Sequence, residues 1–498
     1  MSIEGKVSWE LIKNLKDCLD SYKIRAFLDA KKEIVEQGIY TEEDYKKILF
    51  TMLEREKAKF SLLSFLDEKS INKIEDLQRF SEKESLNFKE TLSLLDLLKN
   101  EGYVDVKEEH ETLENEDDSK KNIFKDFSIN VLTQDPESVK PIYEPVKVIF
   151  DAEICSGCGL CAGICPMDCI EIDNGFGKID EDKCIRCGLC YHVCPRSFLP
   201  IRVLNMYQDS EKEIKDYSNV GPYIEAFCAR TKDEDIKRVS QDGGITSTIL
   251  SFLLEEKLID SAVGATMSNN DPWKPKAMII KNKEDVLSCA GTKYVNNPNL
   301  KLLNHFNNSE MKTAVVGVPC MMQALLKSKI YDTGFPSLNN VKYRIGIFCM
   351  ESFPYEQGFI KICKRLGVSV DQVKKTDINK GKFFIFTEDG KELTVPIKEI
   401  SNLAREDCEV CFDLTSESAD ISIGSIGAPS GWNAILIRTK KGKELYENLI
   451  SKDLIESKKL EDVKPGLPLL VKIAGFKRKG SEKHISKKID QSERYPQY

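Results

Sequence analysis

The sequence predicts an α+β multidomain protein, and three observations along its 498 residues support this prediction. Apolar residues recur at helical spacing through the first hundred residues, two cysteine runs of identical spacing follow, and short apolar runs alternate with helical segments beyond them. A chain of this length should contain about three domains. We expect a helical region over 1–106, a linker over 107–145, a cysteine-rich domain over 146–200, a mixed α/β domain over 201–475 and a basic C-terminal tail over 476–498.

The composition argues against several classes of protein. The formal net charge is -8, so a broad nucleic-acid-binding surface is not expected. No apolar run approaches the roughly 18 residues of a membrane span, and the opening residues lack the apolar core of a signal peptide. Seventeen cysteines without an export signal indicate a reducing compartment, where metal binding is favoured over disulfides. We therefore expect a cytoplasmic, oxygen-sensitive protein.

The end of the helical region has a pattern that resembles a winged helix. Two short helices, a longer helix over about 87–100 and a strand over 103–106 are expected within residues 60–106. These residues contain six Lys or Arg against ten Asp or Glu, which repels a phosphate backbone. We predict a docking module for a protein partner, and a plain helical extension remains the alternative. The charged run over 107–126 is typical of a solvated linker.

The two cysteine runs share the spacing Cys-x2-Cys-x2-Cys-x3-Cys-Pro. This is the pattern of bacterial ferredoxins, in which the fourth cysteine of each run ligates the other cluster. A zinc site needs only four ligands, and disulfides suit a secreted protein, so both are less favoured. We expect Cys169 to be an apolar filler rather than a ligand. One [4Fe-4S] cluster is expected on Cys155, Cys158, Cys161 and Cys194, and a second on Cys165, Cys184, Cys187 and Cys190.

The α/β region contains a second group of cysteines. Runs at 314–318, 343–348 and 433–439 are expected to form buried strands, with helices between them. A Cys-x2-Cys pair and two isolated cysteines at strand ends could bind a third cluster, although buried structural cysteines are common. The candidates for this cluster are Cys320, Cys349, Cys408 and Cys411. The cysteines expected to be structural are Cys18, Cys228, Cys289 and Cys363.

A glycine pair precedes the helix expected over 245–256. Gly243 and Gly244 would free backbone N–H groups to bind an anion, and Thr246, Ser247 and Thr248 would add hydroxyls. A flavin pyrophosphate would suit such a site, and an ordinary glycine turn is the alternative. The second glycine-rich stretch, over 424–432, follows an apolar strand. Neither stretch has the G-x-G-x-x-G spacing, so a Rossmann fold is not supported.

Several short blocks occur in the order expected for one family. They are QDGG (241–244), WKP (273–275), AGTKY (290–294), VPC (318–320), GIFCMESFPY (346–355), DINKGKF (377–383), CEVC (408–411) and GSIGAPSGW (424–432). Over about 220–475 the chain resembles the beta subunits of coenzyme F420-reducing hydrogenase and coenzyme F420-dependent formate dehydrogenase. The cysteine-rich unit ahead of this region is similar to that of the input subunit of coenzyme F420H2 dehydrogenase.

The resemblance implies a flavin-binding α/β domain that carries FAD, a third [4Fe-4S] cluster on the four cysteines above, and a pocket for coenzyme F420 as substrate. The glycines and Thr246 would face the pyrophosphate, and Lys293 would lie near the N1–C2 edge of the flavin. No catalytic side chain is implied. The FAD-site candidates are Gln241, Asp242, Gly243, Gly244, Thr246, Ser247, Thr292, Lys293 and Tyr294.

The implied function is an archaeal coenzyme F420-dependent oxidoreductase of methanogenesis. Hydride would pass between coenzyme F420 and FAD, and single electrons would pass through three [4Fe-4S] clusters to or from a partner protein. The partner would belong to a hydrogenase, formate dehydrogenase, heterodisulfide reductase or membrane dehydrogenase complex. Another hydride carrier such as NAD(P)H, a non-enzymatic ferredoxin-type adaptor and an iron–sulfur DNA-binding sensor remain open alternatives.

Overall fold

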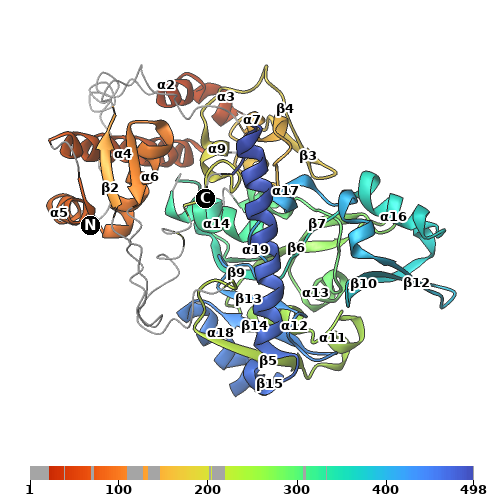
Figure 1. Ribbon diagram of the computed structural model, residues 1–498. Coiled ribbons are helices and arrows are strands. Elements are labelled where there is room, and N and C mark those ends of the chain that lie inside the picture. Colours follow the sequence, from red (N-terminus) through yellow and green to blue (C-terminus); the bar gives the residue numbers. More distant parts are fainter. Residues whose placement is uncertain are drawn as a thin grey trace.

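A computed structural model describes residues 22–36, 38, 40–68, 72–108, 127–132, 146–200, 204, 219–306, 310–331, 334–496 and 498 (Figure 1). Cys18 and most of the predicted linker lie outside these residues. None of the described helices combines the length and apolar character needed to cross a membrane.

The N-terminal module (residues 22–132) consists of helices followed by a two-stranded sheet. Thr41 begins its longest helix, because the Thr41 hydroxyl accepts the Asp44 N–H at 3.1 Å. Gly102, with φ of 86°, ends the last helix in a left-handed conformation. The elements are α2 (Tyr22–Asp29), α3 (Lys31–Glu36), α4 (Glu42–Asp67), α5 (Ile74–Glu84), α6 (Phe88–Glu101), β1 (Val104–Glu108) and β2 (Phe127–Val131).

Strand β2 lies within the residues predicted to be a linker. It pairs antiparallel with β1, with Val104 opposite Val131, and it buries Ile129 completely. The linker prediction is therefore wrong for 127–131. The composition of a five-residue run cannot reveal a partner strand separated from it by a long charged segment.

The N-terminal module packs against the rest of the chain. Tyr40 donates to the carbonyl of Ile164 at 3.2 Å, and the Tyr40 ring contacts Phe335. On its other side, α6 and β2 share a buried cluster with Phe198 and Tyr331. The module thus bridges the cysteine-rich unit and the α/β domain, whatever else it binds.

The ferredoxin-like unit (residues 146–200) has two matching halves. Gly159 and Gly188 occupy left-handed conformations, with φ of 86° and 72°, directly before the short helix of each half. Its elements are α7 (Lys147–Asp151), α8 (Leu160–Gly163), β3 (Ile170–Asp173), β4 (Phe176–Ile179) and α9 (Leu189–Val193).

An eight-stranded mixed sheet forms the centre of the α/β domain. Four neighbouring strands, β13, β9, β8 and β6, are parallel, and the strands outside them are antiparallel. Ala314 and Val315 belong to cores on opposite faces, so both faces of the sheet are covered. The strands in spatial order are β15 (Ile455–Lys459), β5 (Glu225–Thr231), β14 (Asn433–Ile437), β13 (Ile421–Gly424), β9 (Val341–Ile347), β8 (Thr313–Gly317), β6 (Ser261–Met267) and β7 (Pro275–Ile280).

Helices cover the two faces of this sheet. Leu253 of α12 and Leu449 of α18 pack in one core, and Met322 of α14 and Leu303 of η3 pack in the other. The helices that cover or connect the strands are α11 (Glu234–Val239), α12 (Ile245–Glu255), α13 (Lys283–Cys289), η3 (Asn299–Phe306), α14 (Pro319–Ile330), α15 (Pro336–Asn339) and α18 (Lys440–Ser451).

A small three-stranded antiparallel sheet is inserted between β9 and β13 and lies to one side of the domain (Figure 1). Phe353, Phe359 and Phe383 form the centre of its separate core. Its elements are η4 (Tyr355–Phe359), α16 (Ile360–Arg365), η5 (Val370–Gln372), β10 (Val373–Asn379), β11 (Lys382–Thr387), β12 (Glu392–Pro396), η6 (Ile397–Glu399), η7 (Ser401–Leu403) and α17 (Glu406–Glu409).

The long helix α19 (Gly466–Asp490) follows η8 (Leu460–Asp462). It runs across the front of the molecule from the large sheet to the ferredoxin-like unit (Figure 1). The predicted basic tail begins at residue 476, but α19 continues through this position and buries Lys477 and Ser481. The lysine-rich composition marks the exposed face of this helix and not a separate segment.

Replacing Lys59 by Met tests a buried ion cluster in the N-terminal module. Lys59 Nζ contacts Glu56 at 2.8 Å and Glu101 at 2.5 Å, and the lysine is 2% exposed. Removing the cation that both carboxylates contact should lower the free energy of unfolding by about 3–5 kcal/mol. Hydrogen exchange should become faster in α4 and α6. The matched variant Lys46→Met, on the exposed face of α4, should change exchange little; equal effects would contradict the role of the buried cluster.

Candidate functional site

Eight of the nine cysteines of the ferredoxin-like unit form two sets, and each set takes its fourth cysteine from the other run. We call Cys155, Cys158, Cys161 and Cys194 the first ferredoxin set, and Cys165, Cys184, Cys187 and Cys190 the second ferredoxin set. Burial raises the pKa of Cys161 well above its usual value, and the neighbouring thiols of Cys158, Cys155, Cys190 and Cys194 raise it further. The pKa of Cys187 is likewise raised by burial and then by Cys165 and Cys184. Cys194 thus lies near Cys161 of the first run, and Cys165 lies near Cys187 of the second run.

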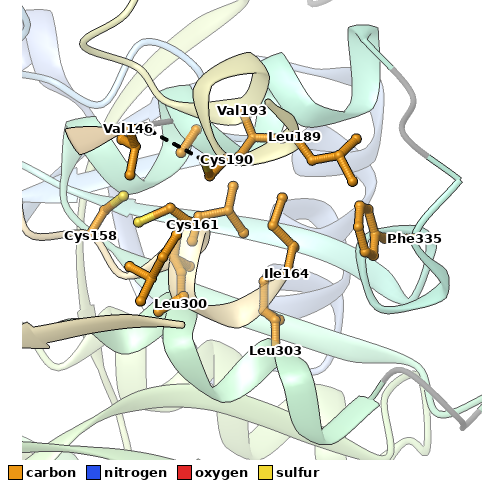
Figure 2. Packing of buried hydrophobic residues seen from close by; sticks show 14 of the residues in the cluster. Val146, Cys158, Cys161, Ile164, Leu189, Cys190, Val193, Leu300, Leu303 and Phe335 are labelled. Carbon is orange, nitrogen blue, oxygen red and sulfur yellow. Dashed lines mark hydrogen bonds between the residues drawn. The ribbon is translucent and has the colours of Figure 1, made fainter. Parts of the chain in front are cut away.

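Backbone N–H groups point at several of these sulfur atoms. Gly157 N–H lies 3.3 Å from Cys155 Sγ, and Val146 N–H lies 3.4 Å from Cys190 Sγ. Figure 2 shows this second bond and the sulfur atoms of Cys158 and Cys161, which point toward one another. Donors aimed at sulfur stabilise the thiolate form that binds iron.

The second ferredoxin set lines a single cavity, which Pro166 and Cys169 also line. Cys169 was expected to be a filler, and it is buried, but its Sγ lies 3.4 Å from Cys165 Sγ. Hydrogen bonding to Cys169 lowers the pKa of both Cys165 and Cys184. Cys169 is therefore a direct neighbour of this set.

The third set consists of Cys320, Cys349, Cys408 and Cys411. Cys320 is the second residue of α14, which follows β8, and Cys349 follows β9. Because β8 and β9 are adjacent and parallel, their carboxyl ends lie at the same edge of the sheet. Burial raises the pKa of Cys408, and Asp407, Cys349 and then Cys411 act on it in the same sense. The structure thus brings together four cysteines that are separated by up to 91 residues in sequence (411 minus 320).

Other cysteines lie apart from the three sets. Cys228 is completely buried in β5, and Cys363 is 2% exposed in the small insert. Cys289 lies 3.8 Å from the sulfur of Met278. These positions agree with structural roles.

Four buried basic side chains lie beside the first ferredoxin set and the third set; burial lowers the pKa of Lys327 well below its usual value, so a neighbouring anion is needed to keep it charged. Lys327 donates to the carbonyl of Cys194 at 2.8 Å, and Lys477 donates to the carbonyl of Cys349 at 2.6 Å. The other two cations are Arg196 and Arg405. Among the described residues, Asp407 is the one carboxylate in ion-pair contact with any of the four.

The buried basic side chains outnumber their carboxylate partners, and this imbalance shows whether an anionic iron–sulfur cluster would fit beside them. Buried cations are costly without a counter-anion, and a cubane held by four thiolates carries a negative charge. The thiolate donors and the surrounding cations therefore suit [4Fe-4S] clusters. In the part of the chain that the structure describes, no three His, Cys, Asp or Glu side chains are grouped as they would be around a single metal ion.

The glycine turn before α12 is packed against the sheet. A Cβ atom on Gly243 would lie 2.6 Å from the carbonyl oxygen of Ala229, and Gly244 has a φ of 72°. Asn433 Oδ1 accepts the Ile245 N–H at 3.2 Å, whereas the N–H groups of Thr246 and Ser247 have no acceptor among the described residues. The glycines thus satisfy a packing requirement, and two N–H donors remain for an anion.

The hydroxyl of Thr248 is not available to a ligand in this structure. It donates to Thr231 Oγ1 at 2.7 Å and lies 3.0 Å from the carbonyl of Gly244. The expected contribution of Thr248 to an anion site is therefore wrong. By contrast, the buried hydroxyls of Ser240 and Thr376 have no hydrogen-bond partner among the described residues, which agrees with a polar ligand near this turn.

Hydrogen bonds gather four of the sequence blocks around the same turn. Gln241 donates to Asp377 at 3.1 Å, and Asp242 accepts a hydrogen bond from Ser425. Tyr294 Oη accepts the Ile378 N–H at 3.1 Å, and burial raises the pKa of Tyr294. Blocks that are far apart in sequence thus form one site. Asn433 also belongs to this site, because it accepts the Ile245 N–H, and sequence reasoning did not identify it.

Lys293 is held by its own loop. Its Nζ donates to the carbonyls of Ala290 at 2.8 Å and Gly291 at 3.0 Å, and also to that of Cys289 at the end of α13. Burial lowers the pKa of Lys293 to about 8. Its neighbour Thr292 is half-buried. Lys293 therefore shapes the AGTKY loop, and any contact of its charge with a flavin would be additional.

Sequence reasoning missed the buried residues Arg196, Arg405 and Asp407. Arg196 directly follows the second Cys-Pro pair, Asp407 directly precedes Cys408, and Arg405 lies three residues before Cys408. A charged residue next to a cysteine motif is a weak signal, because most such residues are exposed.

Comparisons with known proteins agree with this arrangement. Residues 226–304 and 310–463 match the N-terminal and C-terminal models described as coenzyme F420 hydrogenase/dehydrogenase, beta subunit, and residues 147–195 match a 4Fe-4S dicluster domain. The coenzyme F420 hydrogenase subunit beta of Methanothermobacter thermautotrophicus is 36% identical over 270 residues, which cover 54% of this chain and 95% of that protein. The chain belongs to the family of coenzyme F420 hydrogenase/dehydrogenase beta subunits.

Two further relatives extend the comparison within this family. One subunit of the F(420)H(2) dehydrogenase of Methanosarcina mazei is 34% identical over 347 residues, which cover 68% of this chain and 94% of that protein. A chain of the F420-reducing [NiFe] hydrogenase complex from Methanosarcina barkeri has a TM-score of 0.52 and 36% identity, covering 54% of this chain and 94% of that chain.

These matches confirm the resemblance and the enzyme class predicted from sequence, a coenzyme F420-dependent oxidoreductase of the hydrogenase/dehydrogenase beta subunit type. They also confirm the mixed α/β fold with a dicluster ferredoxin-like domain. The winged-helix character of the N-terminal module and the role of each site residue stay predictions.

Replacing Cys349 by Ala tests the third set. If three clusters are bound, the variant should lose about one third of the iron per chain, because one cubane loses a ligand. Iron and acid-labile sulfide should be measured in protein purified without oxygen. Cys228→Ala, which removes a buried thiol in β5, should retain all the iron. Full iron content in the Cys349 variant would exclude that cysteine as a ligand.

Proposed function

We propose that this chain exchanges hydride between coenzyme F420 and FAD and exchanges single electrons with a partner protein. Its main support is the grouping of twelve cysteines into three sets of four, together with a glycine turn around which four of the family's sequence blocks are hydrogen-bonded. FAD accepts two electrons together or one at a time and a [4Fe-4S] cluster carries one, so the bound groups would join hydride chemistry to single-electron transfer.

The three cysteine sets would each hold one cluster. Their thiols are largely buried, so the protein excludes water from the iron and supplies charge compensation through buried cations. Lys327 and Lys477 each donate to the backbone carbonyl of a cysteine, which orients the loop that carries the thiol.

The flavin would lie at the turn before α12. Thr246 and Ser247 would donate backbone N–H groups to the pyrophosphate at the positive end of the helix dipole. Gln241 and Tyr294 bond to the β10 segment and would hold the small insert over the site. Coenzyme F420 would bind against the same edge of the sheet, as ligands do at the carboxyl ends of parallel strands.

A relative in the structural comparison comes from a hydrogenase complex, which supports the idea that this chain is also one subunit of a larger assembly. The partner would take electrons from, or give electrons to, the clusters. Both directions are compatible with the arrangement of residues, since direction depends on the potentials of the carriers.

The decisive experiment uses the full chain purified without oxygen. Flavin and iron should be present, and reduced coenzyme F420 should bleach the flavin absorbance and reduce a viologen dye. Bleaching by NADPH or NADH but not by reduced coenzyme F420 would establish the alternative hydride carrier. Absence of flavin from fully iron-loaded protein would overturn the hydride-transfer function and leave an electron-transfer adaptor.

Gly244→Ala should weaken flavin binding without loss of iron. Gly244 has a φ of 72°, and a Cβ there would lie 2.8 Å from Thr231 and 2.9 Å from Ser240. Strain and displacement of the turn should lower flavin affinity roughly tenfold or more, equivalent to about 1.4 kcal/mol. Flavin content after gel filtration measures this effect.

The matched control is Gly390→Ala. Gly390 also has a positive φ, of 82°, but nothing lies within 4 Å of the added Cβ. This variant should carry the same backbone strain and keep its flavin. If both variants retain flavin fully, the turn before α12 does not hold it.

A further inference from the structure

A buried ion triad lies between the first ferredoxin set and the third set. Asp407 accepts from Arg405 Nε at 2.9 Å and lies 3.4 Å from Arg196 Nη2. Arg196, Asp407 and Arg405 are 1%, 3% and 5% exposed. Because two guanidinium groups share one carboxylate, the triad carries a net positive charge out of contact with water.

Each member of the triad is attached to a cysteine set. Arg196 lies two residues after Cys194, and its N–H points at Cys194 Sγ at 3.4 Å. Asp407 precedes Cys408 directly, and Arg405 donates through its side chain to the carbonyl of Cys155. The triad therefore connects the loops of the two sets.

The positive charges reach both sets. Arg196 acts electrostatically on Cys158 and Cys194 of the first ferredoxin set, and on Cys320 and Cys411 of the third set. Arg405 acts on Cys155 of the first ferredoxin set and on Cys408 of the third set. Cys158 and Cys320 also act on one another. The two sets are thus electrostatic neighbours.

The second ferredoxin set has a different environment. The arginine that acts on its member Cys184 is Arg186, which is exposed to solvent. Charge on an exposed arginine is screened by water and salt, whereas charge on a buried arginine is screened much less.

We infer that Arg196 and Arg405, held in place by Asp407, raise the reduction potentials of the clusters in the first ferredoxin set and the third set together, and that these two clusters exchange electrons directly. This inference rests on the proposed function, since it requires both clusters. A fixed cation in a water-excluded site stabilises the more negative, reduced form of each cluster. Arg196, Arg405 and Asp407 are positioning residues that touch no reacting atom.

Arg196→Gln provides the first test. The variant should keep its iron, and a potentiometric titration followed by electron paramagnetic resonance should show two cluster signals shifted to more negative potentials and one unchanged. Cys349→Ala and Cys184→Ala, each lacking one cluster, identify the signals of the third set and the second ferredoxin set. Arg405→Gln should shift the same two signals in the same direction, which keeps the test valid if the Arg196 variant does not fold.

Asp407→Asn tests the direction of the shift in reduction potential. Removing the carboxylate leaves the two guanidinium charges uncompensated, so the same two signals should shift to less negative potentials. Arg238→Gln, which removes an arginine whose side chain is 73% exposed, should shift none. Shifts of the same sign in the Arg196 and Asp407 variants, or equal shifts in all three clusters, would overturn the electrostatic role.

Direct exchange between the two clusters has its own readout. In fully reduced protein, magnetic coupling between the first and third sets should split their signals. The splitting should survive in Cys184→Ala, which keeps the first ferredoxin set and the third set, and should disappear in the double variant Cys184→Ala/Cys349→Ala; loss of the splitting in Cys184→Ala alone would show that the first ferredoxin set and the third set are not coupled. If wild-type protein contains three clusters and reacts with coenzyme F420 but Arg196→Gln shifts nothing, only this inference fails. If wild-type protein lacks the clusters, the proposed function itself fails.

Discussion

The seating of the ferredoxin-like unit on η3 is the contact on which the rest of the site depends. Leu300 N–H donates to the carbonyl of Cys158 at 3.1 Å, and a Cβ on Gly163 would lie only 2.4 Å from the carbonyl oxygen of Leu300. The cysteine loop therefore lies directly on the α/β domain, with no side chain between the two backbones. The loop at this contact carries Cys158 of the first ferredoxin set, which acts electrostatically on Cys320 of the third set.

The same contact relates the clusters to the candidate flavin site. Asn296 donates to the carbonyl of Ser156 at 3.0 Å, and it lies two residues after Tyr294 in the loop that leads to η3. Phe353, four residues after Cys349, donates its N–H to the carbonyl of Tyr294 at 2.9 Å. One short loop thus contacts the first ferredoxin set, the segment after Cys349 and the small insert. In the proposed function, this loop would bring the flavin and the clusters close together, which would favour electron transfer between them.

The N-terminal module packs against α14 and the segment that carries Cys194, and so stabilises the position of the ferredoxin-like unit. Lys327 of α14 is completely buried and donates to the carbonyls of Cys194 and Phe198, at 2.8 and 2.6 Å. Phe198 in turn packs against Tyr331 and the helices of the module. The module therefore covers the segment that carries Cys194. Its predicted role in docking a protein partner would place that partner close to the clusters.

Much of the chemistry of this protein can be inferred from the order of its residues. The repeated cysteine spacing predicts two clusters that exchange a ligand, because consecutive thiolates on one loop must surround one cubane, and the ordered blocks predict the family. Strands at 314–318, 343–348 and 433–439 were also predicted within two residues of β8, β9 and β14. Local patterns of this kind depend on neighbours along the chain, so a sequence can display them.

Which groups meet in space depends instead on the packing of the folded chain. The pairing of β2 with β1, the use of the Thr248 hydroxyl by Thr231 and the continuation of α19 through residue 476 all depend on partners distant in sequence. The same holds for the triad of Arg196, Asp407 and Arg405, whose members come from two domains. The identity of a charged residue does not reveal whether it is solvated or buried, because its burial is set by the packing of the whole fold.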